Sequence, residues 1–138
     1  VDYSFSPTQV CWGLDNRLVG VRCITDAGPG TRMEVRWAAA DSNPYLVAQG
    51  YLQAGLDGIR NEYELIGQTI GDAHLDESLV RFATNMRDSL ANFSSSAWNL
   101  ECFGKDFVEN FTIMQQNEMA AFAAWVTDWE TQRYRDVI

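Results

Sequence analysis

Basic residues are scarce in this chain of 138 residues. Only 10 Lys and Arg stand against 19 Asp and Glu, which gives a formal net charge of −9. Nucleic-acid binding relies on cationic groups that displace counterions from phosphates, so this balance argues against a nucleic-acid partner. It also argues against a surface that docks on anionic membranes.

Long apolar runs, cysteine pairs and histidine clusters are missing as well. No apolar run approaches about 18 residues, so we expect no membrane-spanning segment. The three cysteines form no CxxC motif and cannot all pair, which favours reduced thiols and a cytoplasmic location. The single histidine, His74, excludes a histidine-rich zinc site. A start on Val1, without Met or a signal region, indicates a piece of a longer protein.

The composition nevertheless predicts a folded chain. With 46% hydrophobic and 12% aromatic residues, it is too apolar for disorder. Residues 1–36 hold four arginines and four acids, so the whole negative excess lies in residues 37–138. We expect one α+β segment, with a strand layer at 1–40 that carries the site and a helical layer at 41–138.

Two β-rich runs predict a short antiparallel strand pair. Residues 18–24 end at a Gly/Pro turn cluster over 26–30, and residues 32–37 then alternate strictly. A period of two is typical of a strand with one apolar face on a core. The apolar face would hold Met33, Val35 and Trp37; the polar face would hold Arg32, Glu34 and Arg36.

Several helices are expected after the strands. Asn43 and Pro44 suit the N-cap and first position of a helix that runs to about Asn61. Three glycines inside it, at 50, 55 and 58, indicate that another element packs closely there. Further helices are predicted at about 76–91 and 105–135, with a short helical turn over 97–102; an apolar stripe begins at Phe107 on the last one.

The charged strand face has two interpretations. It can be an internally paired, solvated surface. Alternatively, Arg17 and Arg22 on the neighbouring strand, or at its entry, could converge with Arg32 and Arg36. Because guanidinium groups bind carboxylates and phosphates bidentately, such arginines around Glu34 would describe a polyphosphate site with a metal ligand. The residue pattern leaves both interpretations open.

Several segments, in order, resemble the C-terminal part of the catalytic domain of glutamine synthetases. They are Asn16-Arg17, Val21-Arg22, Arg32-Met-Glu-Val-Arg36, Asn43-Pro-Tyr-Leu46, Ala54-Gly-Leu-Asp-Gly58, Phe103-Gly-Lys-Asp-Phe-Val108 and Val126-Thr-Asp-Trp-Glu130. The resemblance covers most of the 138 residues. The resemblance is specific because several motifs occur together in the order in which the family has them.

The resemblance implies an ATP-dependent carboxylate–amine ligase. Such an enzyme forms γ-glutamyl amides from glutamate and ammonia or a primary amine through a γ-glutamyl phosphate. By the same resemblance, Arg17 and Arg32 are catalytic and, together with Arg22, contact ATP. Arg36 would hold glutamate, and Glu34 would coordinate Mg²⁺ or Mn²⁺. The resemblance also implies that the full-length protein assembles into ring oligomers.

Other outcomes stay open at this stage. The family's remaining metal-binding elements lie upstream of the matched motifs, so we expect this segment alone to be inactive. The tail favours a small amine or polyamine as acceptor over ammonia. A noncatalytic relative kept as a scaffold or regulator is the alternative function, and a stand-alone anion-binding module is a third.

Overall fold

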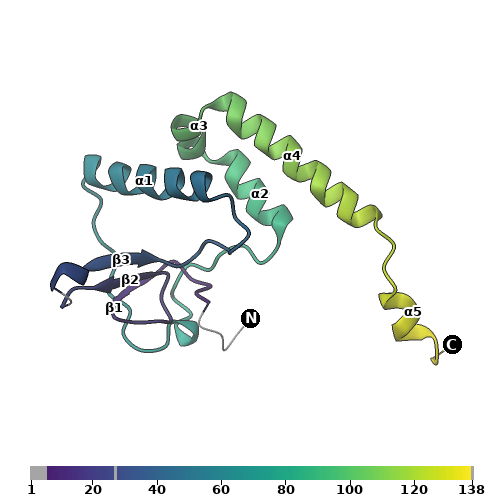
Figure 1. The fold of residues 1–138 in the computed structure, drawn as a ribbon, viewed down its shortest axis with the longest axis horizontal. Helices are drawn as coiled ribbons and strands as arrows, with labels where there is room; N and C mark the ends of the chain where they lie inside the picture. The colour runs from purple at the N-terminus through teal and green to yellow at the C-terminus, as the bar shows by residue number, and fades with distance from the viewer. Residues whose placement is uncertain (1–5, 27, 138) are drawn as a thin grey trace. The chain divides into compact units, whose positions relative to one another are not determined.

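The computed structural model of the protein describes residues 6–26 and 28–137. The chain divides into two compact units, Val1–Phe82 and Ala83–Ile138 (Figure 1). The first contains a small sheet and a long helix, and the second is helical. The predicted α+β class is therefore confirmed. That both units belong to one catalytic domain stays a prediction.

The first unit is organised around a three-stranded sheet in the order β1-β2-β3. Its strands are β1 (Trp12–Leu14), β2 (Val21–Ile24) and β3 (Arg32–Val35). Strands β2 and β3 are antiparallel, which confirms the predicted pair. A 3-10 turn, η1 (Gly28–Gly30), lies between them; Ala27 of the predicted turn is outside the described residues. Strand β1 was not predicted, because three residues show no alternation.

The connection from β1 to β2 is unusually short. The two strands run parallel, with Leu14 opposite Cys23, and residues 15–20 join them. Parallel neighbours normally need a dozen or more connecting residues, so this loop doubles back sharply along the sheet. The turn starts at Asp15, whose φ of 44° lies in the left-handed region that Asp tolerates better than most residues. The loop carries Arg17, one of the predicted site residues.

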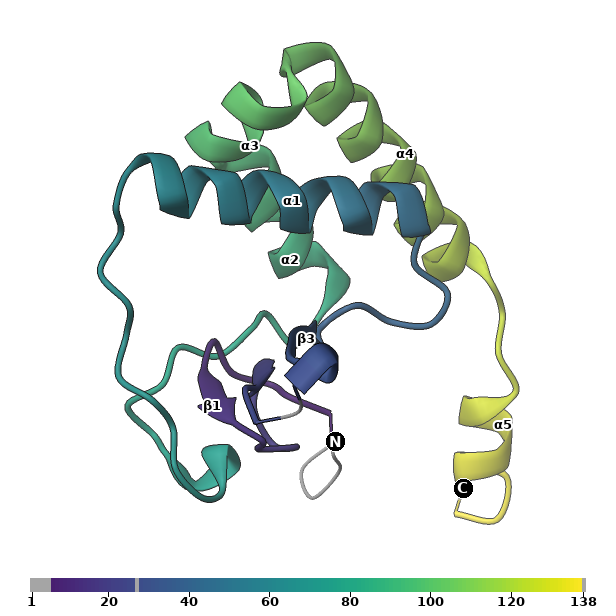
Figure 2. The ribbon, with the colours of Figure 1, turned by 60° about the vertical axis from the view of Figure 1, so that its left-hand side comes forward.

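An irregular segment over 61–82 lies beside β1 and closes the core of this unit (Figure 2). Thr69 N–H donates to the Trp12 carbonyl at 2.9 Å, and Val10 N–H donates to the Val80 carbonyl at 2.8 Å. The small core between them contains Cys11, Val19 and Ala73, with Leu79 packed against it. The three cysteines, Cys11, Cys23 and Cys102, are free thiols, as predicted.

The predicted helix over 76–91 is wrong in its first half. Val80 and Phe82 hydrogen-bond with the chain at Val10 and Thr8, so their backbone groups are not available to a helix. The helix begins only at Met86, where the Asn85 side chain accepts from the Asp88 N–H at 2.9 Å.

The apolar face of β3 is only partly covered by the described residues. Met33 is 70% exposed, contrary to the prediction that its face rests on a core. It borders an apolar hollow of about 300 Å³ on the sheet. The hollow is lined by Val10, Cys11, Trp12, Val21, Cys23, Met33, Trp37, Leu65 and Ile66.

Helix α1 (Pro44–Arg60) begins as predicted. The Asn43 side chain accepts hydrogen bonds from the N–H groups of Tyr45 and Leu46, at 3.0 and 3.4 Å. The close packing expected at its glycines is not found at Gly55 or Gly58 among the described residues. A Cβ at Gly55 would meet nothing within 4 Å, and one at Gly58 only the ring of Tyr63 at 4.0 Å.

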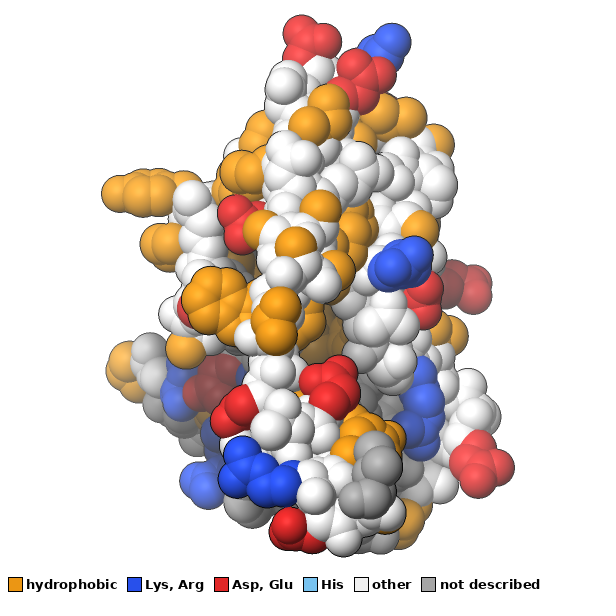
Figure 3. Space-filling model, turned by 90° about the vertical axis from the view of Figure 1, so that its right-hand side faces the viewer, with side chains coloured by type: hydrophobic (Ala, Val, Ile, Leu, Met, Phe, Trp, Pro, Cys, Tyr) orange, Lys and Arg blue, Asp and Glu red, His pale blue; other side chains and the backbone are white. Residues whose placement is uncertain are grey.

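The second unit packs its helices around aromatic rings. It contains α2 (Met86–Ser95), α3 (Ala97–Phe103), α4 (Lys105–Ala124) and α5 (Trp129–Tyr134). Phe107 and Phe111 stack at 5.7 Å between ring centroids, and Phe103 and Phe93 extend the cluster. Apolar side chains also lie at the surface of this unit (Figure 3); Phe122 of α4 is one of them. None of the described helices has the length and apolar character needed to cross a bilayer.

The predicted final helix over 105–135 is not continuous. It stops at Trp125, whose backbone is extended, with φ −72° and ψ 121°. The Thr127 hydroxyl then accepts from the Trp129 N–H at 3.4 Å, where the short α5 begins. Hydroxyl side chains compete in this way with helical hydrogen bonding, and the apolar stripe does not reveal it.

We predict that the Asn43 cap contributes measurably to the first unit. Replacing Asn43 with Ala should lower the free energy of unfolding by about 1 kcal/mol, because two N–H groups of α1 lose their acceptor. Asn43→Asp, which keeps an acceptor oxygen, should retain most of the stabilisation that the cap provides. Hydrogen exchange at the Tyr45 and Leu46 amides checks the cause: unchanged exchange in Asn43→Ala would show that the cap is dispensable.

Candidate active site

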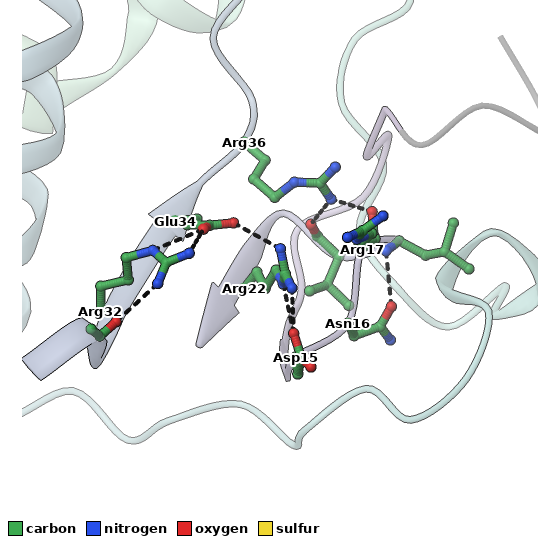
Figure 4. A network of polar contacts seen from close by, with 10 residues as sticks. Asp15, Asn16, Arg17, Arg22, Arg32, Glu34 and Arg36 are labelled. Atoms are coloured by element: carbon green, nitrogen blue, oxygen red, sulfur yellow. Dashed lines mark hydrogen bonds and ion pairs between the residues drawn. The ribbon is translucent and has the colours of Figure 1, made fainter. Parts of the chain in front are cut away.

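The polar face of the sheet brings charged residues from both antiparallel strands together. Arg22 of β2 lies directly opposite Glu34 of β3. Arg22 Nη1 donates to Glu34 Oε2 at 3.2 Å, and the same guanidinium pairs with Asp15 at the end of β1 through Nε and Nη2 (Figure 4). The Arg22 side chain is only 18% exposed. One guanidinium therefore links all three strands.

Glu34 is held from its other side by Arg32 of the same strand. Arg32 Nη2 and Nε donate to Glu34 Oε1 at 2.7 and 3.0 Å. A third bond, from Arg32 Nη1 to the Gly30 carbonyl at 2.9 Å, fixes the guanidinium to η1. Each oxygen of the Glu34 carboxylate thus accepts from a different arginine, and the Arg32 side chain stays 52% exposed.

Arg36 follows β3 and reaches back to the short loop. Its Nη1 donates to the Val19 carbonyl at 3.2 Å and to the Arg17 carbonyl (Figure 4). Asn16 fastens the same loop independently: its Oδ1 accepts from the Leu18 N–H, and its Nδ2 donates to the Gly71 carbonyl, both at 2.8 Å. The backbone that carries Arg17 is therefore held on both sides.

The Arg17 side chain is exposed and, among the described residues, its guanidinium makes no hydrogen bond or ion pair. Four arginines and two carboxylates make up this arginine–carboxylate network, namely Asp15, Arg17, Arg22, Arg32, Glu34 and Arg36. Its formal charge is +2 within a chain of −9. The network is therefore a local cationic surface suited to anionic groups.

The ion pairs stabilise the charged form of each partner. A hydrogen bond from Arg32 lowers the pKa of the Glu34 carboxyl below its ordinary value of 4.5; Arg22 acts in the same direction and burial opposes it. A hydrogen bond from Arg22 lowers the pKa of the Asp15 carboxyl below 3.8. The same bond raises the pKa of the Arg22 guanidinium. Both carboxylates are therefore ionised at neutral pH.

The described residues do not by themselves form a metal site. Three or more His, Cys, Asp or Glu side chains grouped to hold a metal ion are not found among them. Glu34 offers one carboxylate, and both of its oxygens already accept from arginines. A hard cation such as Mg²⁺ prefers six oxygen ligands, so it would need ligands from outside this part of the chain.

The structure distributes the predicted site residues over two groups, one on the polar face of the sheet and one around the loop before β2. Arg22, Arg32 and Glu34 are in direct contact, whereas Arg17 and Arg36 meet through the loop backbone. Sequence reasoning missed Asp15 and Asn16 as parts of the site. The pair Asp15-Asn16 is a turn signal in its own right, which could have indicated a sharp loop before Arg17.

These pKa directions predict an acid-dependent stability. Folding depresses the pKa values of Glu34 and Asp15. Their contribution to the free energy of unfolding is therefore complete above the ordinary pKa values, and it is lost as the pH falls through the pKa values of the folded state. Because Asp15 is exposed, solvent screening reduces its contribution to the free energy of unfolding. Glu34→Gln should therefore show a shallower loss of unfolding free energy below pH 4.5 than the natural protein in urea titrations. Parallel curves would contradict a stabilising Glu34 carboxylate.

Known proteins with related sequences and structures match nearly the whole chain. The glutamate–isopropylamine ligase of a Pseudomonas species is 36% identical over 92% of this chain and 28% of its own length. The gamma-glutamylethanolamide synthetase GlnA4 of Streptomyces coelicolor is 36% identical over 94% of this chain and 28% of its own. A structure of a GmaS/ADP complex superimposes with a TM-score of 0.80, at 27% identity, over 96% of this chain and 30% of that one.

The chain thus spans less than a third of the length of these relatives. A family model described as the glutamine synthetase catalytic domain matches residues 1–134. The match includes every residue of the arginine–carboxylate network and most of the second unit. The chain belongs to the glutamine synthetase family.

Proposed function

We propose that this chain is the C-terminal part of the catalytic domain of an ATP-dependent ligase that joins glutamate to ammonia or a primary amine. The arginine–carboxylate network carries the proposal. It gathers positive charge on an ordered sheet face of an otherwise acidic chain. Glutamate and ATP are both anionic, and a ligase has to hold them together while charge develops between them.

The names of the relatives support an amine acceptor. One relative is a glutamate–isopropylamine ligase and another a gamma-glutamylethanolamide synthetase, so both are named for amides of glutamate with organic amines. The proposal applies to a longer protein, because the chain spans only 28% of each. Whether this protein takes ammonia or a larger amine depends on residues outside the arginine–carboxylate network.

ATP would supply the phosphoryl group that activates the γ-carboxylate of glutamate. In this proposal Arg17 and Arg32 contact its phosphates and disperse the negative charge of the transferring group, with Arg22 supporting them. Phosphoryl transfer asks mainly for positioning and charge stabilisation, which guanidinium groups provide. Arg32 is half exposed and anchored to the Gly30 carbonyl, so its donors are oriented without being enclosed.

Arg36 is proposed to hold a carboxylate of glutamate. Two backbone carbonyls of the loop fix its Nη1, which orients the planar guanidinium. Glu34 is proposed as one ligand of Mg²⁺ or Mn²⁺, with the other ligands supplied from outside the described residues. The segment alone is therefore proposed to be inactive. We further propose a cytoplasmic protein that assembles into rings.

The proposal is tested with the full-length protein in an assay of ADP release. Glutamate and ATP with Mg²⁺ should give ADP release that depends on ammonia, isopropylamine or ethanolamine, and mass spectrometry should detect the matching γ-glutamyl amide. The 138-residue segment assayed alone should release none. A full-length protein that binds ATP but releases no ADP with any acceptor would contradict the ligase and favour a noncatalytic scaffold.

A matched pair of variants separates a metal-binding role of Glu34 from its role as an ion-pair partner. Glu34→Gln and Asp15→Asn each remove one carboxylate bound to Arg22. If Glu34 is a metal ligand, Glu34→Gln should lower kcat/KM by roughly hundredfold or more, because such a ligand supports several kcal/mol of charge stabilisation. Asp15→Asn should lower kcat/KM by less than about tenfold, because it removes only an exposed ion pair. Equal losses of kcat/KM in the two variants would show that Glu34 acts only as an ion-pair partner of Arg22 and not as a metal ligand.

A further inference from the structure

The indole of Trp37 occupies the space where residue 20 would carry a side chain. A Cβ added to Gly20 would lie 2.0 Å from Nε1, 2.2 Å from Cε2 and 2.4 Å from Cζ2 of Trp37. These separations are far below van der Waals contact, so any side chain at position 20 displaces the ring. Phe82 packs edge-on against the indole, with 5.4 Å between centroids and 73° between planes. We call Gly20 and Phe82 the indole seat.

Packing, rather than hydrogen bonding, holds the ring there. The Trp37 Nε1–H is buried and has no hydrogen-bond partner in the described part of the chain. Leaving a buried donor unpaired is unfavourable, so contact with the seat has to offset it. The absence of a side chain at position 20 is what allows this close approach.

The seat lies directly beside the bonds that orient Arg36. Arg36 N–H donates to the Gly20 carbonyl at 2.9 Å, which extends the β2–β3 ladder by one pair. Its Nη1 donates to the Val19 carbonyl at 3.2 Å and to the Arg17 carbonyl. Val19 is fully buried, so its carbonyl belongs to a fixed part of the loop. A ring displaced from Gly20 would shift the backbone on which the Arg36 side chain stands.

We infer that Trp37, seated on Gly20, is a positioning residue that sets the guanidinium of Arg36 for a carboxylate of the substrate. The inference rests on the proposed role of Arg36 in holding glutamate and adds the residues that make its geometry. A long arginine side chain has many rotamers, so fixing it before binding removes an entropy cost from glutamate affinity. Loss of the seat therefore weakens glutamate binding in particular.

The phosphate-facing part of the site keeps contacts that do not involve the seat, although the Arg17 carbonyl also accepts from Arg36. The loop that carries Arg17 has its own fastenings, through Asn16 to the Gly71 carbonyl and through the Asp15–Arg22 ion pair. Arg32 is tied to Gly30 and Glu34 on the far side of the network. Displacing the indole should therefore separate the glutamate KM from the ATP KM, which a general loss of stability would not do.

The test uses four variants of the full-length protein and steady-state kinetics. Gly20→Ala displaces the ring, Trp37→Ala removes it, and Trp37→Phe keeps an aromatic ring on the seat. Gly67→Ala is the matched control, because a Cβ there meets none of the described residues within 4 Å. Gly20→Ala and Trp37→Ala should raise the glutamate KM roughly ten- to hundredfold, the range expected for a lost charge-assisted hydrogen bond. The ATP KM should stay within about twofold, and Trp37→Phe and Gly67→Ala should resemble the natural protein.

The double variant sharpens this test. If both single changes act through the same seat, the double variant should have almost the same glutamate KM as Trp37→Ala alone. Additive effects, or a parallel rise of the glutamate and ATP KM values, would overturn the inference. If Gly20→Ala does not fold, the contrast between Trp37→Ala and Trp37→Phe decides it alone.

A structural measurement keeps this inference separate from the proposed function. If the natural full-length protein shows no ligase activity, the proposed function fails. A crystal structure of Gly20→Ala or Trp37→Ala then decides whether the seat positions Arg36. Loss of the 3.2 Å contact between Arg36 Nη1 and the Val19 carbonyl would support the seat. Retention of that contact after the ring has left Gly20 would overturn it.

Discussion

The guanidinium of Arg22 holds the polar face of the sheet together, and the other charged residues take their places around it. It pairs with Glu34 across the antiparallel strands and with Asp15 at the end of β1. A guanidinium can do this because its donors lie in one plane and point in several directions, whereas an ammonium is a single point charge. The Arg22 side chain is largely buried, so removal of both carboxylates would leave a poorly solvated cation.

The arrangement around Arg22 also depends on the tight loop between β1 and β2. Because residues 15–20 double back over such a short distance, Asp15 is brought within reach of Arg22, seven residues later. The same turn places the carbonyls of Arg17 and Val19 in front of Arg36. Backbone geometry and ion pairing therefore support each other.

Periodic and local signals predicted the parts of this structure that they physically determine. The alternation over 32–37 predicted β3 and its charged face, and Asn43-Pro44 predicted the start of α1, because caps and strand faces depend on neighbouring residues. Strand β1 was not predicted because a run of three residues is too short to show an alternating pattern. Residues 76–85 were misassigned because the backbone at Val80 and Phe82 hydrogen-bonds to a segment about 70 residues away, which no local pattern reveals.

The candidate site was predictable only in part, for a similar reason. Residue type and spacing predicted that Arg32 and Glu34 share a face and left open whether Arg22 joins them; the strand register shows that Arg22 lies opposite Glu34. They could not indicate that Glu34 has an arginine on each oxygen, or that Asp15 completes the set. The Glu34 contacts follow from the β2–β3 register and from the position of Arg32 two residues earlier on β3, whereas the Asp15 contact follows from the sharp loop. Nor could the sequence indicate the pairing of Gly20 with Trp37, since a glycine reveals a close approach only when its neighbour in space is known.

Surface area supports the proposal that this site works within a larger domain. The protein exposes 10901 Å², whereas a self-contained globular protein of 15.6 kDa exposes about 7,200 Å², and two separate globules the size of its units about 8,700 Å². Part of the excess is apolar and close to the site: Met33 stands beside the open hollow, with Val21 and Cys23 of β2 among its lining residues. Because the charged network and the hollow share the same strands, a layer that covers the hollow would also stiffen the strands that carry Arg22 and Glu34. The order of the charged face is therefore coupled to the burial of the apolar residues on the same strands.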